Sequence, residues 1–150
     1  MYYSAGINMS PDYQRDLVWS DEDRQALISS IMANVDIGKF VVSKKPYSEW
    51  TELGYGLEII DGKQRLDTLV RFYQDEFKWE SPKGPRLFSE LQPLERSQIE
   101  SHPIPYAELD DATEEQILRI FLMVNTHGHV VEKAHLDRVR DRYDEVLKIK

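Results

Sequence analysis

The sequence contains no cysteine, so disulfide bonds and thiolate metal sites are excluded. It also lacks any apolar run that approaches the length of a bilayer-spanning helix. Residues 1–6 have neither the basic segment nor the apolar core of a secretory signal, so we expect a cytoplasmic location and no membrane partner. Basic residues are the minority: 19 against 27 acidic residues give a net charge of -8, which argues against a broad electrostatic grip on DNA or RNA by this chain alone.

What is present is the composition of a globular protein. The 150 residues are 41% hydrophobic and 31% charged, and no internal repeat or low-complexity tract is visible. This length is sufficient for one domain with a buried core. Short β-branched segments are interspersed with amphipathic ones, and we therefore expect residues 1–150 to form a single mixed α/β domain with a small sheet flanked by helices.

The most informative stretch is residues 57–69. Ile59 and Ile60 predict a short buried strand, and the Asp61-Gly62 step after them predicts a tight turn. A helix is expected next, running to about residue 77. Its apolar stripe is expected to consist of residues at three- and four-residue spacing, namely Leu66, Leu69, Val70, Tyr73 and Phe77.

The first turn of that helix carries two cations. The first backbone N–H groups of a helix have no partner within the helix, and the positive end of the helix dipole lies behind them. Lys63 and Arg65 oppose this dipole unless an anion lies between them, so a bound phosphate would resolve the conflict. The alternative is that Asp61-Gly62 is only a turn and that both cations are solvated.

Other segments have recognisable boundaries. Ser20 is a good N-cap for a helix that extends to about residue 36 with Val35 on its buried face, and Thr113 with Gln116 resembles a capping box. Residues 40–43 predict a strand, and two prolines place the strand-like segment at 103–109 either at a sheet edge or outside the hydrogen-bonded ladder. We also expect a short hairpin near 82–85, a helix that begins at Pro93, and a last helix from about residue 132.

Three separated pieces of the chain together resemble one family. They are Tyr13-Gln14-Arg15 followed by Val18-Trp19, then Asp61-Gly62-Lys63-Gln64-Arg65, and finally Phe121, Asn125 and Gly128 at matching spacing. This pattern resembles the domains with an Asp-Gly-Gln-Gln-Arg signature in the ParB/sulfiredoxin-like group, as found in GmrSD-type modification-dependent restriction systems. Lys63 replaces the usual first glutamine of the signature.

The resemblance implies a compact ParB/sulfiredoxin-like domain that binds a nucleoside triphosphate, of unspecified base, with Mg²⁺. Hydrolysis would act as a switch in phage defence or DNA processing. The implied catalytic residues are Asp61, also the metal ligand, and Gln64. The implied nucleotide-binding residues are Gly62, Lys63, Arg65, Gln14, Arg15, Asn125, His127 and Gly128.

The sequence leaves several roles open. Arg65 could instead pair with Asp67 or Glu58, and Asp61 could cap the helix after Gly62. Gln14 and Arg15 could belong to an internal polar network, His127 could be a surface residue, and Tyr13 and Trp19 are expected to be core residues. The number of subunits is also left open.

The function has alternatives as well. The chain could be a non-catalytic regulatory or protein-interaction module that keeps the phosphate pocket, or a domain that recognises modified DNA and works with a separate nuclease protein. The restriction relatives carry an HNH nuclease region, whereas His102, His127, His129 and His135 lack an obvious metal-ligand spacing. We therefore do not expect nuclease activity in this chain.

Overall fold

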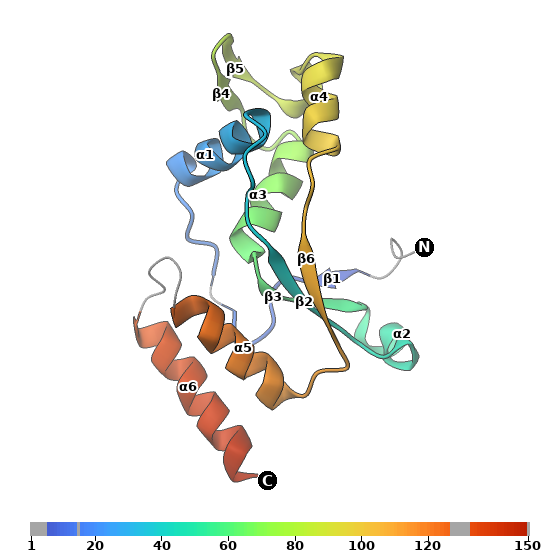
Figure 1. Cartoon of the computed structure of the whole chain (residues 1–150), viewed down its shortest axis with the longest axis vertical. Helices are drawn as coiled ribbons and strands as arrows, with labels where there is room; N and C mark the ends of the chain where they lie inside the picture. The colour runs from blue at the N-terminus through green and yellow to red at the C-terminus, as the bar shows by residue number, and fades with distance from the viewer. Residues whose placement is uncertain (1–5, 15, 127–132, 150) are drawn as a thin grey trace. The chain divides into compact units, whose positions relative to one another are not determined.

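The computed structural model describes residues 6–14, 16–126 and 133–149, and these residues form a mixed α/β structure (Figure 1). Contacts within the chain define two compact units. The first unit consists of Met1–Asp16, Phe40–Asp61 and Tyr106–Lys150, and the second consists of Leu17–Lys39 and Gly62–Pro105. The mixed α/β prediction is confirmed, whereas the assignment of the whole chain to one domain stays a prediction. None of the described helices is both long and apolar enough to cross a membrane.

The first unit is built on a four-stranded mixed sheet with the order β1-β3-β2-β6. Strand β1 (Ile7–Asn8) is parallel to β3 (Leu57–Asp61), which is antiparallel to β2 (Phe40–Lys44), and β2 is parallel to β6 (Tyr106–Asp110). A short 3-10 turn η1 (Tyr47–Glu49) and helix α2 (Trp50–Leu53) connect β2 to β3. The strands predicted at 40–43 and before Gly62 are confirmed. The segment expected at 103–109 forms β6 only from Tyr106 onward, so both prolines lie outside the strand, and β6 is at the edge of the sheet.

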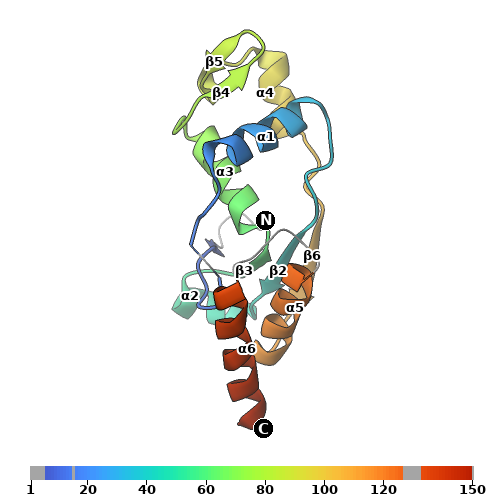
Figure 2. The same ribbon diagram turned by 90° about the vertical axis from the view of Figure 1, so that its left-hand side faces the viewer.

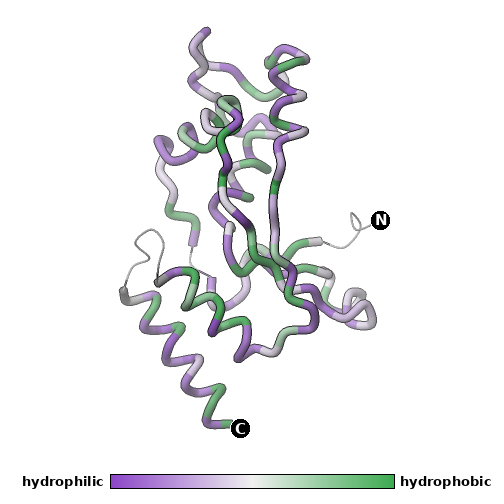
Figure 3. Tube along the Cα trace, viewed as in Figure 1, coloured by the Kyte–Doolittle hydropathy of each residue, from purple (hydrophilic) through white to green (hydrophobic). Residues whose placement is uncertain are grey.

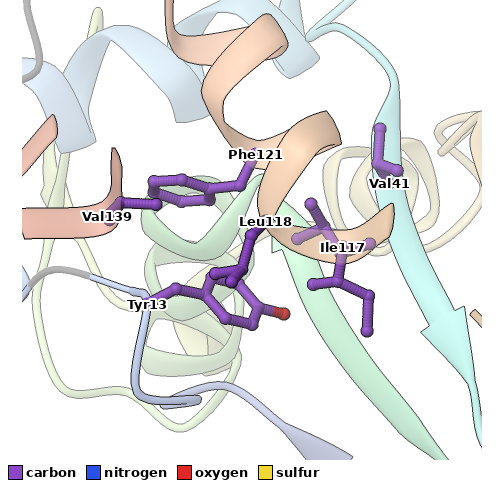
Figure 4. Packing of buried hydrophobic residues seen from close by; sticks show 7 residues of the cluster. Tyr13, Val41, Ile117, Leu118, Phe121 and Val139 are labelled. Atoms are coloured by element: carbon purple, nitrogen blue, oxygen red, sulfur yellow. The ribbon is translucent and has the colours of Figure 1, made fainter. Parts of the chain in front are cut away.

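The core of the first unit lies between the sheet and helix α5 (Glu114–Thr126), with helix α6 (Lys133–Lys148) packed on α5. Figure 4 shows the side chains of Leu118 and Phe121 from α5 together with Tyr13, and Val139 of α6 directed at the Phe121 ring. The Tyr13 and Phe121 ring centroids are 5.3 Å apart, and Tyr13 is only 9% exposed. Hydrophobic and hydrophilic residues alternate along α6, as expected for a helix that buries one face (Figure 3). The prediction that Tyr13 is a core residue is confirmed.

The second unit is mostly helical. It contains α1 (Asp21–Met32), α3 (Lys63–Tyr73) and α4 (Pro93–Glu100), the hairpin of β4 (Trp79–Ser81) and β5 (Gly84–Arg86), and the 3-10 turn η2 (Phe88–Glu90). Figures 1 and 2 both show α1 beside α3, and both show the hairpin close to α1 and α4. The core of this unit consists of Ile28, Phe72, Trp79, Phe88 and Leu91. The predicted hairpin and the helix that begins at Pro93 are both confirmed.

The predicted helix caps are present. The Ser20 side chain accepts a hydrogen bond from the Asp23 N–H, and the Asp23 carboxylate accepts one from the Ser20 N–H at 2.9 Å. At α5, the Gln116 side chain accepts from the Thr113 N–H at 2.9 Å, and the Thr113 hydroxyl accepts from the Gln116 N–H. Each cap satisfies backbone donors that the helix itself leaves without a partner.

Three expectations about the second unit are wrong: the end of α1, the buried face of α3 and the end of α3. Helix α1 ends at Met32 rather than near residue 36, because Asn34 adopts a left-handed conformation (φ 57°) that ends the helix, and Val35 is 52% exposed. The buried face of α3 is also not the predicted one: Thr68 and Phe72 are 1% exposed, whereas Val70 and Tyr73 are 41% and 62% exposed.

The packing of Phe72 explains this orientation of α3. Its ring lies 5.8 Å from that of Phe88 and 5.4 Å from that of Phe77, so the aromatic core of the second unit fixes which side of α3 is covered. Thr68 tolerates burial because its hydroxyl donates to the Gln64 carbonyl of the same helix at 2.8 Å. Leu69 packs at the margin of this core, as predicted. Phe77 also packs there, but it lies outside α3: the helix ends at Tyr73 rather than near residue 77, and Asp75 shortly after it adopts a left-handed conformation (φ 60°).

Candidate functional site

The candidate site begins where β3 ends and α3 begins. Asp61 is the last residue of β3, Gly62 follows with φ 107°, and Lys63 is the first residue of α3. This φ value is in the left-handed region that favours glycine, which explains the residue type at position 62. Gly62, not Asp61, is therefore the N-cap of α3, and the predicted strand, turn and start of the helix are confirmed.

The first turn of α3 differs in charge from those of three other helices. Helix α1 begins with Asp21, Glu22 and Asp23, and acidic residues also occupy the first turns of α4 and α5. These carboxylates complement the positive end of the helix dipole. The first turn of α3 has no acidic residue and instead carries Lys63 and Arg65, so it suits an external anion better than the first turns of α1, α4 and α5 do.

Arg65 is held by backbone carbonyl groups of the second unit. Its Nη1 donates to the Ile37 carbonyl oxygen at 2.8 Å, and its Nη2 donates to the Lys39 carbonyl oxygen at 3.2 Å. The two carboxylates that the sequence offered as salt-bridge partners have other partners: Asp67 lies 2.7 Å from Arg71 Nε, and Glu58 lies 2.7 Å from Lys45 Nζ. The guanidinium is thus fixed in orientation by carbonyl groups more than 25 residues before it in the chain.

Gln64 joins two of the three pieces of the sequence pattern. Its side-chain Oε1 accepts hydrogen bonds from the backbone N–H groups of Val18 and Trp19, at 3.1 and 3.2 Å. The Val18-Trp19 segment is therefore attached to the first turn of α3 within the second unit. Trp19 is only partly buried and Val18 is 58% exposed, so backbone hydrogen bonds contribute directly to holding this segment.

Gln14 binds the end of β3 within the first unit. Its Nε2 donates to the carbonyl oxygens of Ile59 and Ile60, at 2.9 and 2.7 Å, immediately before Asp61 in the chain. The Tyr13 hydroxyl also donates to the Ile59 carbonyl, at 3.2 Å. Burial raises the pKa of the Tyr13 phenol far above its ordinary value, and the nearby Glu58 carboxylate raises it further, so the hydroxyl keeps its proton and remains a donor.

The third piece of the pattern lies in the C-terminal part of the first unit. Asn125 is in the last turn of α5, and its Nδ2 donates to the Phe121 carbonyl oxygen at 2.7 Å. The other residues predicted there, His127 and Gly128, lie outside the described residues, and so does Arg15. The assembly of Gln14 and Asn125 with residues 63–65 around one ligand stays a prediction.

The sequence did not identify two residues that lie against members of the three-piece sequence pattern. Gly38 lies between the two carbonyl groups that hold Arg65, and the local signal was the Asp36-Ile37-Gly38 sequence, which is typical of a turn. His135 in α6 is 7% exposed, and its Nε2 lies 2.9 Å from the Tyr13 carbonyl oxygen. Because a carbonyl can only accept, Nε2 carries the proton in this contact. No local signal indicated this link over more than 100 residues.

A metal at this site would have few protein ligands. Within residues 6–14, 16–126 and 133–149, no three side chains of the histidine and carboxylate type gather as a metal-binding group. A metal held mainly by phosphate oxygens needs only one or two carboxylates. Asp61 directly precedes Gly62, the N-cap of α3, and its role as a metal ligand stays a prediction.

Comparisons with known proteins give one match. The family described as "GmrSD restriction endonuclease, N-terminal domain" matches residues 2–139, which include all three pieces of the sequence pattern. No curated protein and no solved structure matches the chain.

Proposed function

This chain belongs to the family of GmrSD restriction endonuclease N-terminal domains, and we propose that it binds a nucleoside triphosphate at the start of α3 and hydrolyses it. Family membership makes the chain a component of a phage-defence restriction system. In this proposal, nucleotide binding and hydrolysis are the switch that controls cleavage of DNA by a nuclease partner. Nucleotide binding, nucleotide hydrolysis and control of DNA cleavage are the parts that we propose; the restriction-system context follows from the family.

The charge pattern of α3 is the observation that carries the proposal. Lys63 and Arg65 occupy the first turn, where the helix dipole disfavours cations, and that turn itself contains no acidic residue. A triphosphate supplies several negative charges that would bind the cations and the backbone N–H groups together. Arg65 is the stronger ligand because its guanidinium is planar, always charged and held in orientation by the Ile37 and Lys39 carbonyl oxygens.

The residues of the pattern have separate roles in this mechanism. The N-terminus of α3 binds phosphate oxygens, Arg65 neutralises charge on the transferred group, and Lys63 adds a second cation. Bound Mg²⁺ would supply further neutralisation, with Asp61 as its protein ligand. Gln64 Oε1 already accepts two backbone hydrogen bonds, so we assign the orientation of the attacking water to Asp61 and the placement of the Val18-Trp19 segment to Gln64.

Isothermal titration with the four common ribonucleoside triphosphates, in the presence of Mg²⁺, tests the binding step. We expect wild-type protein to bind at least one of them and Arg65→Ala to bind it about 10- to 100-fold more weakly, the loss typical of a charged hydrogen bond. Arg71→Ala is the matched control, because Arg71 lies on the same helix and pairs with Asp67 and Glu76. Absence of binding by wild type, or equal weakening by both variants, would refute the proposal.

A non-catalytic regulatory module is the second candidate function. It is favoured by the geometry of Gln64, whose side-chain oxygen is engaged by two backbone donors, and by Lys63 in place of the usual glutamine of the signature. Measurement of phosphate release with and without Mg²⁺ distinguishes the two candidates. Release that requires Mg²⁺ and is lost in Asp61→Asn supports hydrolysis, whereas binding without release supports the regulatory module.

Contact with DNA is a separate question for the same system. The net charge of -8 disfavours a nonspecific grip on the phosphate backbone. We therefore propose that DNA contact by this chain depends on its nuclease partner. A mobility-shift assay over a range of salt concentrations tests this: binding of DNA by the isolated chain that falls steeply with salt would contradict the proposal.

A further inference from the structure

Residues 36–39 form a loop around the guanidinium of Arg65. The loop follows α1 in the second unit and provides the two carbonyl oxygens, of Ile37 and Lys39, that accept hydrogen bonds from Arg65 Nη1 and Nη2. Gly38 lies between these two residues, so both of its neighbours bind the same side chain. The loop is therefore a specific receptor for the Arg65 head group within this unit.

A side chain at position 38 would meet the end of the Arg65 side chain. A Cβ atom at position 38 would lie 2.7 Å from Arg65 Nη1 and 3.7 Å from Arg65 Cζ. The first distance is below any normal contact of a Cβ atom, so either the loop or the guanidinium would have to shift. The displaced atom is the same Nη1 that donates to the Ile37 carbonyl, and the shift would weaken that 2.8 Å hydrogen bond.

The conformation of the loop is set locally. Gly38 has φ 87°, in the left-handed region, and its N–H donates to the Asp36 carboxylate at 2.9 Å. A hydrogen bond from a residue to the Asp side chain two positions before it is a typical turn motif. Asp36 is exposed, so its side chain serves this turn without contributing to the core.

We infer that Gly38 is a positioning residue for Arg65 and, with Asp36, sets the direction in which the guanidinium is presented to phosphate; this inference rests on the proposed triphosphate site. Guanidinium recognition of phosphate depends on the plane and direction of its N–H groups more than on charge alone. Two carbonyl groups fix that plane, and the absence of a side chain at position 38 allows the head group to approach them. The role of Gly38 is therefore exerted through Arg65.

A competing explanation is that position 38 needs glycine only because of its backbone conformation. Gly84 provides a matched control in the same unit: its φ is 102°, and a Cβ added there meets nothing within 4 Å. Gly84→Ala therefore introduces the strain of a positive φ without a clash. Any additional effect of Gly38→Ala reports on the contact with Arg65.

The test uses wild type, Gly38→Ala, Gly84→Ala, Arg65→Ala and the double variant of positions 38 and 65. Titration with the triphosphate that wild type binds best should show Gly84→Ala unchanged and Gly38→Ala weakened about 10-fold or more. In the Arg65→Ala background, Gly38→Ala should cause no further loss, because its effect requires the guanidinium. Urea unfolding should show the same dependence: the destabilisation by Gly38→Ala in excess of Gly84→Ala should disappear when Arg65 is absent.

Asp36→Ala is the second variant, for use if Gly38→Ala does not fold. It removes only the carboxylate that accepts from the Gly38 N–H, and we expect severalfold weaker triphosphate binding that also disappears in the Arg65→Ala background. Wild-type binding that is lost in Arg65→Ala but unchanged in Gly38→Ala or Asp36→Ala overturns the inference and leaves the proposed function intact. Absence of wild-type binding overturns both, even if the unfolding experiment still shows that positions 38 and 65 are coupled.

Discussion

Replacement of Gln14 by glutamate tests whether this residue holds the end of β3. Gln14 Nε2 donates to two carbonyl oxygens, of Ile59 at 2.9 Å and of Ile60 at 2.7 Å. A glutamate has nearly the same shape, but its ionised carboxylate only accepts hydrogen bonds. Gln14→Glu therefore places a negative charge against two carbonyl oxygens and removes both donors from the strand that leads into the candidate site.

The expected cost follows from the two lost hydrogen bonds. Each is worth about 0.5–1.5 kcal/mol of net stability, so Gln14→Ala should lower the free energy of unfolding by about 1–3 kcal/mol. Gln14→Glu should cost more than this near neutral pH, because the carboxylate also repels the carbonyl oxygens. When protonated, the carboxyl group can donate to one of the two oxygens, and its cost should then fall to about 1 kcal/mol.

The pH dependence has a definite sign. The carbonyl environment favours the protonated form, so in the folded Gln14→Glu variant the pKa of the introduced carboxyl group lies above its unfolded value. A group with a raised folded pKa contributes stability that is complete below its unfolded pKa and is lost as pH rises through its folded pKa. The free energy of unfolding of Gln14→Glu should therefore be only slightly below that of wild type near about pH 4 and far below it near about pH 7.5. The difference between Gln14→Ala and wild type should not change with pH.

Urea unfolding, followed by tryptophan fluorescence at several pH values, measures these deficits. Gln74→Glu is the charge control, since it adds the same charge at an exposed position. A Gln14→Glu variant as stable as wild type at neutral pH, or a deficit that does not vary with pH, would show that Gln14 does not hold β3. A variant that folds normally but no longer binds triphosphate would instead support the nucleotide contact expected from the sequence.

Two further predictions concern ion pairs. Lys45 Nζ lies 2.7 Å from the carboxylate of Glu58, whose side chain is only 9% exposed. Lys45→Met should therefore lower the free energy of unfolding by about 3 kcal/mol, because it leaves this buried carboxylate without its cationic partner. Urea unfolding should show that adding Glu58→Leu recovers most of this loss. Hydrogen bonds from Arg86, and secondarily from a backbone N–H, lower the pKa of Glu95 from 4.5 to about 2. The stability contributed by Glu95 is thus complete above pH 4.5 and is lost as pH falls toward about 2. Glu95→Gln should therefore reduce the dependence of the free energy of unfolding on pH in this acid range. An NMR titration in which the Glu95 pKa is not lowered would contradict this prediction.

Features determined within a few residues of one another could be predicted from the sequence. The Ser20 and Thr113 caps, the turn at Gly62 and the helix start at Pro93 each depend on the residue itself and its nearest neighbours. The exclusion of Pro103 and Pro105 from β6 is local in the same way, because a proline cannot donate to a sheet. The mixed α/β class followed from these local patterns.

The orientation of α3 could not be predicted in this way. Its apolar residues are spread over more than one side, and the sequence alone favoured a stripe that included Val70 and Tyr73, both of which are exposed. The side that is buried contains Phe72, and it was selected by the aromatic rings of Phe77 and Phe88, which other segments bring to it. Burial depends on partners that are distant in the chain, and the periodicity of a helix does not identify them.

The sequence by itself determined that a turn with a left-handed glycine opens a helix bearing Lys63 and Arg65, because this information is contained in five consecutive residues. Only the tertiary structure decided what those side chains contact. The carbonyl partners of Arg65 lie 26 and 28 residues away, and the backbone partners of Gln64 lie more than 40 residues away. Carbonyl and N–H groups are the same in every residue, so the identity of a backbone partner leaves no signature in the sequence.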